Sequence, residues 1–384
     1  ILGLVFQLGL LVAVKYAGFF FGAFIDLPKL HLPLGVSFYT FHAISYLVDV
    51  YRQKTPPQKN LLRLGLYLAL FPKLVMGPIV PYHELEPALA QRTIDAQDVS
   101  DGCLRFTIGL AKKALLADAL AGLVTGIWGD LASLTVLSAW LGLIGYALQL
   151  YFDFSGYSDM AIGLGRMLGF RFPENFRYPY LCSSISDFWR RWHISLGSWF
   201  KEYLYFPLGG SRTGTLRTLR NLLLVWLATG LWHGASWNYV LWGLYFGVLI
   251  CLEKLLAPRF RAHPRKGLLA GLYRPVYLLL AVLGWVLFRA EDLPAAGRYF
   301  ACLFGGAAGA SAQARLYLHD FWPVLLLGAV DATPLCAKLA GRLGAKLQPG
   351  VRAAVQAVLV LALLACSTVW LLNGSFQSFV YFQF

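Results

Sequence analysis

Residues 132–159 read ASLTVLSAWLGLIGYALQLYFDFSGYSD, and the part before Asp153 carries no charged side chain. A helix needs about 20 mainly apolar residues to cross a membrane. A membrane β-barrel would show short segments of alternating polarity instead, and this run is continuous. The stretch therefore predicts a membrane helix that leads directly into a group of acidic and aromatic residues.

The rest of the chain has the same character. Of its 384 residues, 58% are hydrophobic and 14% are charged, and the mean hydropathy is +0.60. A soluble domain carries roughly 25% charged residues, so the composition excludes a soluble enzyme, and it also excludes a disordered chain. We predict an all-α polytopic membrane protein. Its apolar segments cover residues 1–25, 33–50, 61–80, 104–128, 132–152, 219–250, 270–288, 316–332 and 353–373.

The charges lie mostly between these segments. There are 33 Lys and Arg against 19 Asp and Glu, which gives a net charge of +14. Clusters such as 52–63, 254–266 and 338–352 follow the pattern of cytoplasmic loops and predict contact with anionic membrane lipids, not with nucleic acid. Segment 104–128 contains Lys112, Lys113 and Asp118 and is therefore expected at the membrane interface. The six cysteines are scattered, which supports neither a disulfide framework nor a metal site.

Residues 145–245 are unusual because carboxylates, arginines and histidines are packed among aromatic residues there. Asp153 and Asp159 belong to the acidic motif, and the runs PEN (173–175) and DFWRRWHIS (187–195) follow. Such groups are costly at membrane depth unless they surround a water-filled cavity or a protein interior. We therefore predict that this region is the functional one.

His193 is the first candidate for chemistry. Ser184 and Asp187 have the spacing of a helix cap, and Asp187 precedes Arg191 by four residues, as in a helical ion pair. The pattern predicts one amphipathic helix over 184–204 with His193 on its aromatic face. Two interpretations of His193 stay open at this point: a functional group, or a structural histidine bonded to a backbone carbonyl.

His233 is the second candidate. It lies in the long apolar segment 219–250, where a continuous helix would surround it with Thr229, Gly230, Ser236 and Trp237. Burial disfavours the charged imidazolium, and a neutral imidazole beside a cavity is suited to act as a general base. The alternative is a hydrogen bond between helices. The other histidines are weaker candidates. His42 fits a structural role better, His83 is expected in a loop, and the spacing supports no metal site.

Several of these motifs together resemble one known family, the membrane-bound O-acyltransferases. The resemblance is carried by QLYFDFSGYSD (149–159), MLGFRFPEN (167–175), DFWRRWHIS (187–195), LWHGA (231–235), SFYTFHAISYLVDVYR (37–52), FPKLVMGP (71–78), GWVLFRA (284–290) and FVYFQF (379–384). It is closest to the bacterial branch that acetylates exported polysaccharides. It implies a single membrane domain over 1–384, a multi-helix bundle around a central chamber with re-entrant or interfacial helices, and a catalytic core at about 145–250. Further N-terminal spans of the family are expected to be missing from this sequence.

The resemblance also implies a chemistry and its residues. An acyl group passes from a cytoplasmic thioester, acetyl-CoA, to a hydroxyl, and no bound cofactor or metal is expected. The invariant histidine of the family falls on His233 and its second polar residue on His193. A neutral His233 would accept the hydroxyl proton, and His193 would orient the acceptor or stabilise the oxyanion. Residues expected to bind the donor or line the chamber are Arg190, Arg191, Arg212, Asp153 and Asp159.

The expected setting is the bacterial inner membrane, with alginate as the acceptor and periplasmic acetyltransferases of a polysaccharide export system as partners. The alternatives are O-acetylation of peptidoglycan or cellulose, D-alanylation of teichoic acid, and a transporter or flippase. Transporters often show repeated halves, which this sequence lacks. The aromatic C-terminus contains one phenol, Tyr381. It is a candidate acyl relay, and an interfacial aromatic anchor is the alternative.

Overall fold

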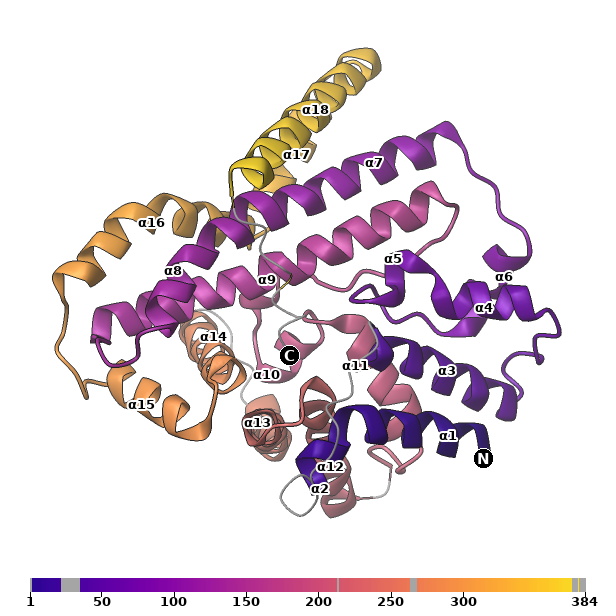
Figure 1. Cartoon of the computed structure of the whole chain (residues 1–384), viewed down its shortest axis with the longest axis horizontal. Helices are drawn as coiled ribbons and strands as arrows, with labels where there is room; N and C mark the ends of the chain where they lie inside the picture. The colour runs from indigo at the N-terminus through magenta and orange to yellow at the C-terminus, as the bar shows by residue number, and fades with distance from the viewer. Residues whose placement is uncertain (1, 22–34, 213, 263–267, 375–378, 380–384) are drawn as a thin grey trace.

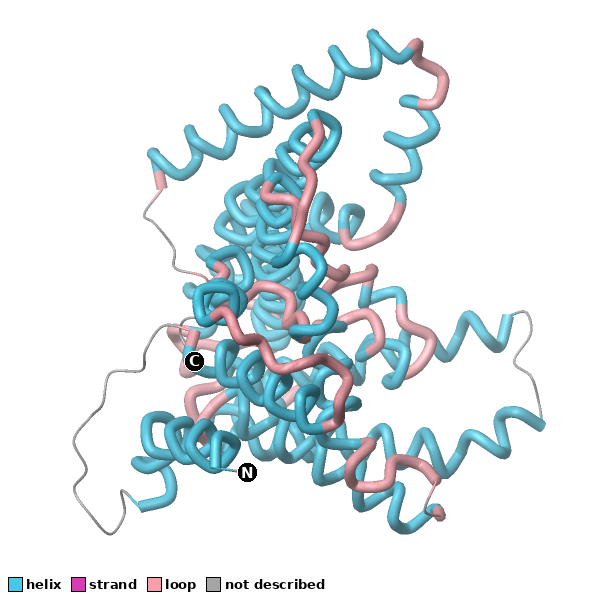
Figure 2. The backbone as a smooth tube through the Cα atoms, turned by 90° about the vertical axis from the view of Figure 1, so that its right-hand side faces the viewer, coloured by secondary structure: helices cyan, strands magenta, loops and turns pink. Residues whose placement is uncertain are grey.

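The structure is a computed structural model that describes residues 2–21, 35–212, 214–262, 268–374 and 379. These residues form helices and loops without strands (Figure 2). The α-helices are α1 (Leu2–Leu11), α2 (Ala17–Phe21), α3 (Val36–Tyr51), α4 (Leu61–Ala69), α5 (Phe71–Leu74), α6 (Tyr82–Ala90), α7 (Ala96–Ala111), α8 (Asp118–Trp128), α9 (Val136–Met167), α10 (Ile185–Trp189), α11 (Ile194–Phe200), α12 (Thr215–His233), α13 (Trp237–Ala262), α14 (Leu268–Arg289), α15 (Leu293–Leu303), α16 (Ala312–Asp331), α17 (Leu335–Gly344) and α18 (Pro349–Asn373). Shorter turns are the π-helical η1 (Val12–Tyr16), η2 (Lys112–Ala117) and η4 (Lys201–Tyr205) and the 3₁₀ turn η3 (Pro179–Leu181).

Helix α9 is the centre of the bundle (Figure 1). Thr135 caps it, because its side chain accepts a hydrogen bond from the backbone N–H of Ser138. The helix continues through Met167, so the acidic motif at 153–159 belongs to the same helix as the apolar run before it. Helices α7, α8, α14, α15 and α16 all contact α9.

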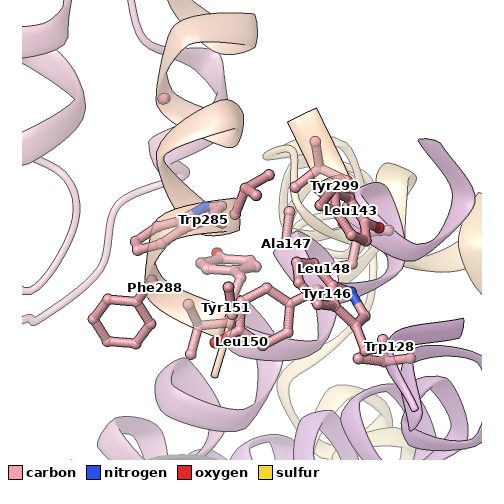
Figure 3. Packing of buried hydrophobic residues seen from close by; sticks show 14 of the residues in the cluster. Trp128, Leu143, Tyr146, Ala147, Leu148, Leu150, Tyr151, Trp285, Phe288 and Tyr299 are labelled. Carbon is pink, nitrogen blue, oxygen red and sulfur yellow. The ribbon is translucent and has the colours of Figure 1, made fainter. Parts of the chain in front are cut away.

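Aromatic side chains fill the core on one side of α9 (Figure 3). Trp128 of α8 stacks on Tyr299 of α15 with ring centroids 3.9 Å apart, and Tyr146 of α9 is fully buried beside them. Trp285 and Phe288 extend this cluster from α14. Aromatic side chains bury large areas at interfaces and dominate packing, so this cluster holds α8, α9, α14 and α15 together.

Helices α7 and α9 lie side by side because glycines allow their backbones to touch (Figure 1). A Cβ atom on Gly109 would lie 2.5 Å from the carbonyl oxygen of Gly156, and one on Gly156 would lie 2.7 Å from that of Gly109. Small residues permit this close approach of membrane helices. The contact also lets Lys112 pair with Asp159 at 2.8 Å.

Two predicted segments are each divided in the structure. Segment 219–250 forms two helices, α12 and α13, because Gly234 is extended (φ −172°, ψ 156°) and ends α12 at His233. The two helices pack closely at Gly230, where a Cβ atom would lie 2.3 Å from the carbonyl oxygen of Tyr239. Segment 61–80 breaks at Leu70, which is extended (φ −62°, ψ 102°), and Pro72 stands at the start of the short α5 that follows.

Four described helices are long and apolar enough to cross a membrane, and the pair α16 and α17, bent by 67°, would form a fifth span. The four are Leu2–Phe21, Val136–Met167, Trp237–Leu256 and Pro349–Asn373. The protein is therefore a multi-pass membrane protein. Helix α18 packs on α7 and η2, and it extends away from the rest of the bundle (Figures 1 and 2).

Candidate functional site

His233 ends α12 inside the bundle, with 8% of its surface exposed. Its ring contacts three aromatic rings: Trp232 and Trp242 at 4.9 Å each, and Phe288 at 5.1 Å between centroids. Only two of the four neighbours that a continuous helix would give His233 lie on the same helix. Thr229 and Gly230 precede it on the same helix, but Ser236 and Trp237 lie beyond the break at Gly234.

His193 lies at a second break in the chain. The single helix predicted over 184–204 is wrong, because His193 is in the left-handed region (φ 45°, ψ 54°). α10 ends before this turn and α11 begins after it. Non-glycine residues rarely adopt this conformation, and it persists where surrounding contacts hold it. The expected cap at Ser184 is present, since its side chain accepts from the backbone N–H of Asp187.

Asn175 supplies those contacts. Its Oδ1 atom accepts hydrogen bonds from the backbone N–H and the hydroxyl of Ser195, at 3.1 and 2.9 Å, and lies 3.2 Å from Nδ1 of His193. Its backbone carbonyl accepts from the N–H of Ile194 at 3.0 Å, and its Nδ2 donates to Ser158 on α9 at 3.1 Å. The partner of His193 is therefore a side-chain amide rather than the backbone carbonyl considered above.

This arrangement determines the tautomer of His193. An amide oxygen only accepts hydrogen bonds, so Nδ1 of His193 carries the proton and donates it to Asn175. Nε2 then has a free lone pair, and it is buried without a hydrogen-bond partner among the described residues. His193 lies in the turn between α10 and α11, outside the spanning helices, and burial lowers its pKa to about 3. The imidazole is neutral at pH 7.

Trp232 brings the two histidines into one site. Its ring lies 4.9 Å from the ring of His233 and 6.2 Å from that of His193. Phe154 of α9 closes the side next to His193, at 4.7 Å between ring centroids. The fold thus gathers two buried imidazoles within an aromatic enclosure, although 40 positions separate them in the sequence.

Most of the other predicted site residues form ion pairs. Arg191 forms the expected ion pair with Asp187, at 3.0 Å, while Arg190 and Arg212 are exposed. Asp153 pairs with Lys113 at 2.7 Å. Asp159 pairs with Arg105 at 2.6 Å as well as with Lys112. Both carboxylates are thus held in ion pairs inside the bundle. Lys112 and Lys113, whose charges suggested an interfacial position for segment 104–128, are the partners in two of these pairs.

Tyr381 lies outside the described residues. Phe379, two positions earlier, is described and half-buried. Its ring lies 5.2 Å from that of Tyr157 on α9 and 4.7 Å from Nζ of Lys113. It packs against the same hydrophobic cluster that contains Phe154 and Trp232. Phe379 therefore reaches the hydrophobic cluster that borders the histidines.

Sequence reasoning missed a polar cavity beside α11. This cavity of about 320 Å³ is bounded by residues of several elements, including Lys54, His83, Ser195, Ser198, Lys201, Glu202 and Tyr203. His83 lies on α6 and not in the predicted loop. The fully buried Asp49 accepts hydrogen bonds at Oδ2 from Nδ1 of His83 and from the hydroxyl of Tyr203, at 2.8 Å each. The hydrogen bond from Lys54 lowers the pKa of Glu202 below its usual value.

A comparison with models of protein families identifies the family of the chain. The model of the membrane-bound O-acyltransferase family matches residues 52–289, which include both histidines, Asn175 and the aromatic enclosure. The chain belongs to this family.

Three relatives illustrate its range. The chain is 45% identical to the probable alginate O-acetylase AlgI of Pseudomonas aeruginosa, over 79% of the chain and 60% of that protein. It is 40% identical to the protein of the same name from Pseudomonas putida, over 92% of the chain and 75% of that protein. A peptidoglycan O-acetyltransferase of Helicobacter pylori is 37% identical, over 77% of the chain and 62% of that protein. The chain thus spans less than two thirds of the length of the first of these relatives.

Proposed function

We propose that this protein is an O-acyltransferase that moves acetyl groups from acetyl-CoA across the membrane for O-acetylation of an exported polysaccharide, with alginate as the acceptor. The observation that carries the proposal is the enclosure of two buried histidines, His193 and His233, by the same tryptophan. The names of the alginate relatives support the acceptor.

The chemistry moves one proton in two steps, through His233. As the acceptor oxygen attacks the thioester carbonyl, His233 takes the hydroxyl proton. The carbon–sulfur bond then breaks, and the same proton passes to the leaving thiolate. His193 has an unprotonated Nε2, so it is proposed to accept a hydrogen bond from a neighbouring hydroxyl of the acceptor and to orient the hydroxyl that attacks. The aromatic walls exclude water and thereby limit hydrolysis of the thioester.

The donor is proposed to enter through the polar cavity beside α11. Ser195 lines this cavity and bonds to the same Asn175 oxygen that accepts from His193. The cavity therefore lies next to the turn at His193, because Ile194 and Ser195, the two residues that follow it, both line the cavity. Lys54 and Lys201 at its rim are suited to phosphate groups, and basic residues mark cytoplasmic ends of membrane segments. This position fits a donor that arrives from the cytoplasm.

We place the protein in the bacterial inner membrane, with a periplasmic acetyltransferase of an export system as its partner. The second candidate function is peptidoglycan O-acetylation, which the Helicobacter pylori relative favours. The two functions share the donor and the site and differ only in the acceptor, so an acceptor assay separates them.

Membranes that contain the chain should cleave radiolabelled acetyl-CoA and transfer the label to mannuronate oligosaccharides. Free thiol and labelled sugar are measured together, with membranes that lack the chain as the control. Label on peptidoglycan fragments instead would overturn the alginate assignment. If neither thiol nor labelled product forms, the acyltransferase proposal itself is wrong.

Tyr381 is proposed as a relay that carries the acetyl group away from the site, because the neighbouring Phe379 already lies against the interior cluster. Its phenol oxygen would attack the thioester, and the resulting ester would pass the acetyl group on. Mass spectrometry of the C-terminal peptide after incubation with acetyl-CoA should show a mass increase of one acetyl group, which Tyr381→Phe removes. An unmodified tyrosine together with an active Tyr381→Phe variant would leave only the role of an interfacial anchor.

A further inference from the structure

The first helical segment, Leu2–Phe21, carries a single charged side chain, Lys15. The segment is apolar enough to cross a membrane, and only 11% of its apolar window is buried inside the bundle. A lone lysine is costly in such a helix and usually marks a functional contact. It also lies in the π-helical turn η1, Val12–Tyr16, a distortion that is frequent at functional sites.

Lys15 and its neighbour Tyr16 both bond to the end of the helix that carries His233. Nζ of Lys15 donates to the carbonyl oxygen of Trp232 at 2.6 Å and to the hydroxyl of Ser37 at 3.3 Å. The hydroxyl of the buried Tyr16 donates to the carbonyl oxygen of Leu231 at 2.8 Å. Two consecutive side chains thus hold two consecutive carbonyls more than 200 positions away.

The end of α12 requires such partners. The last four carbonyls of a helix have no partner within the helix, and the chain beyond His233 turns away at the extended Gly234. The carbonyl of Gly230 accepts from the N–H of Gly234 at 3.4 Å. The next two carbonyls, of Leu231 and Trp232, accept hydrogen bonds from Tyr16 and Lys15 respectively. The charge of Lys15 is also favourable there, because the C-terminal end of a helix is the negative end of its dipole.

We propose that Lys15 and Tyr16 form the C-terminal cap of α12 and are positioning residues for His233. The proposal rests on the catalytic role proposed above for His233. The carbonyl held by Lys15 belongs to the peptide bond that joins Trp232 to His233. A tilt of this peptide would therefore move the imidazole relative to the reacting groups, and small displacements of a catalytic group lower the rate steeply.

The test compares Lys15→Met, Lys15→Arg and Tyr16→Phe in the acetyl-transfer assay. Lys15→Met should lower kcat about tenfold with little change in KM, because positioning acts on the transition state and not on substrate binding. Lys15→Arg keeps the charge and a donor, so it should restore most of the rate. Tyr39→Phe is the matched control, since Tyr39 packs in the same cluster as Tyr16 and its hydroxyl, unlike that of Tyr16, forms no hydrogen bond to a described residue. It should retain the full rate.

A second measurement is independent of the catalytic role of His233. Diethyl pyrocarbonate modifies neutral imidazoles that it can reach, so the slow modification of the buried His233 depends on how firmly the end of α12 is held. Mass spectrometry gives this modification rate in each variant. Lys15→Met should change this rate at least twofold at an unchanged melting temperature, and Tyr39→Phe should not. If His233→Ala proves active while the modification rate still changes, the cap stands and the catalytic proposal falls. A wild-type kcat and modification rate in both Lys15→Met and Tyr16→Phe would overturn the cap. If Lys15→Met does not accumulate in membranes, the kcat and modification rate of Tyr16→Phe decide whether the cap exists. This variant removes a single hydroxyl and should therefore still fold.

Discussion

Replacing His233 by alanine should abolish acetyl transfer while the protein still inserts into the membrane. Removal of a general base typically costs a factor of about 10²–10⁴ in rate. The side chain lies among Trp232, Trp242 and Phe288, so these rings keep the surrounding packing when the imidazole is lost. The acetyl content of the polymer and the amount of protein in the membrane are measured together.

Two further variants make this result specific. His233→Gln retains a polar side chain of similar length but not the base, so it should be as inactive as His233→Ala. His319→Ala is the control, because this histidine is exposed and pairs only with the adjacent Asp320 among the described residues. It should be fully active. Near-normal acetylation by His233→Ala at a normal protein level would refute the assignment of the base.

The parts of the fold that follow from local polarity were predictable from the sequence. The apolar run before Asp153 and the run at 353–373 both form long helices, α9 and α18. Breaks in helices were harder to predict. The turn at His193 depends on hydrogen bonds to Asn175, which is 18 positions away in the sequence. The break at Leu70 shows no helix-breaking residue at its own position, although Pro72 follows closely and was available as a signal.

The same distinction applies to the site. His233 and His193 were identified because polar groups are rare in apolar surroundings, and the family resemblance pointed to the same two residues. The sequence assigns no separate role to Asn175 within the run PEN (173–175) or to Lys15, because the roles of both come from contacts that the sequence does not display. Lys15 still left a signal, a single charge in an apolar helix. Asp153 and Asp159 were expected to bind the donor or line the chamber. In the structure they pair with Lys113 on η2 and Arg105 on α7, and the sequence does not display these contacts.

His193→Ala should lose most of the activity but retain a measurable fraction, because His233 still accepts the proton. Asn175→Ala should have a smaller effect of the same kind. It leaves His193 in place but removes the acceptor that holds its proton on Nδ1. A hydrogen bond contributes about 0.5–1.5 kcal/mol net, and 1.4 kcal/mol is about a tenfold change in rate. We therefore expect kcat to fall by up to about tenfold in Asn175→Ala.

The double variant distinguishes orientation from simple loss of packing. If Asn175 acts through the tautomer of His193, then Asn175→Ala should lower the rate little further once His193 is alanine, because residues that act as a unit are not additive. Ser158→Ala is the matched control. It removes the side-chain partner of Asn175 on α9 and leaves the bonds of Asn175 to His193 and Ser195 in place. If the fold-losses in rate of the two single variants multiply in the double variant, Asn175 serves the packing of the turn. A fully active His193→Ala would show that His193 is structural.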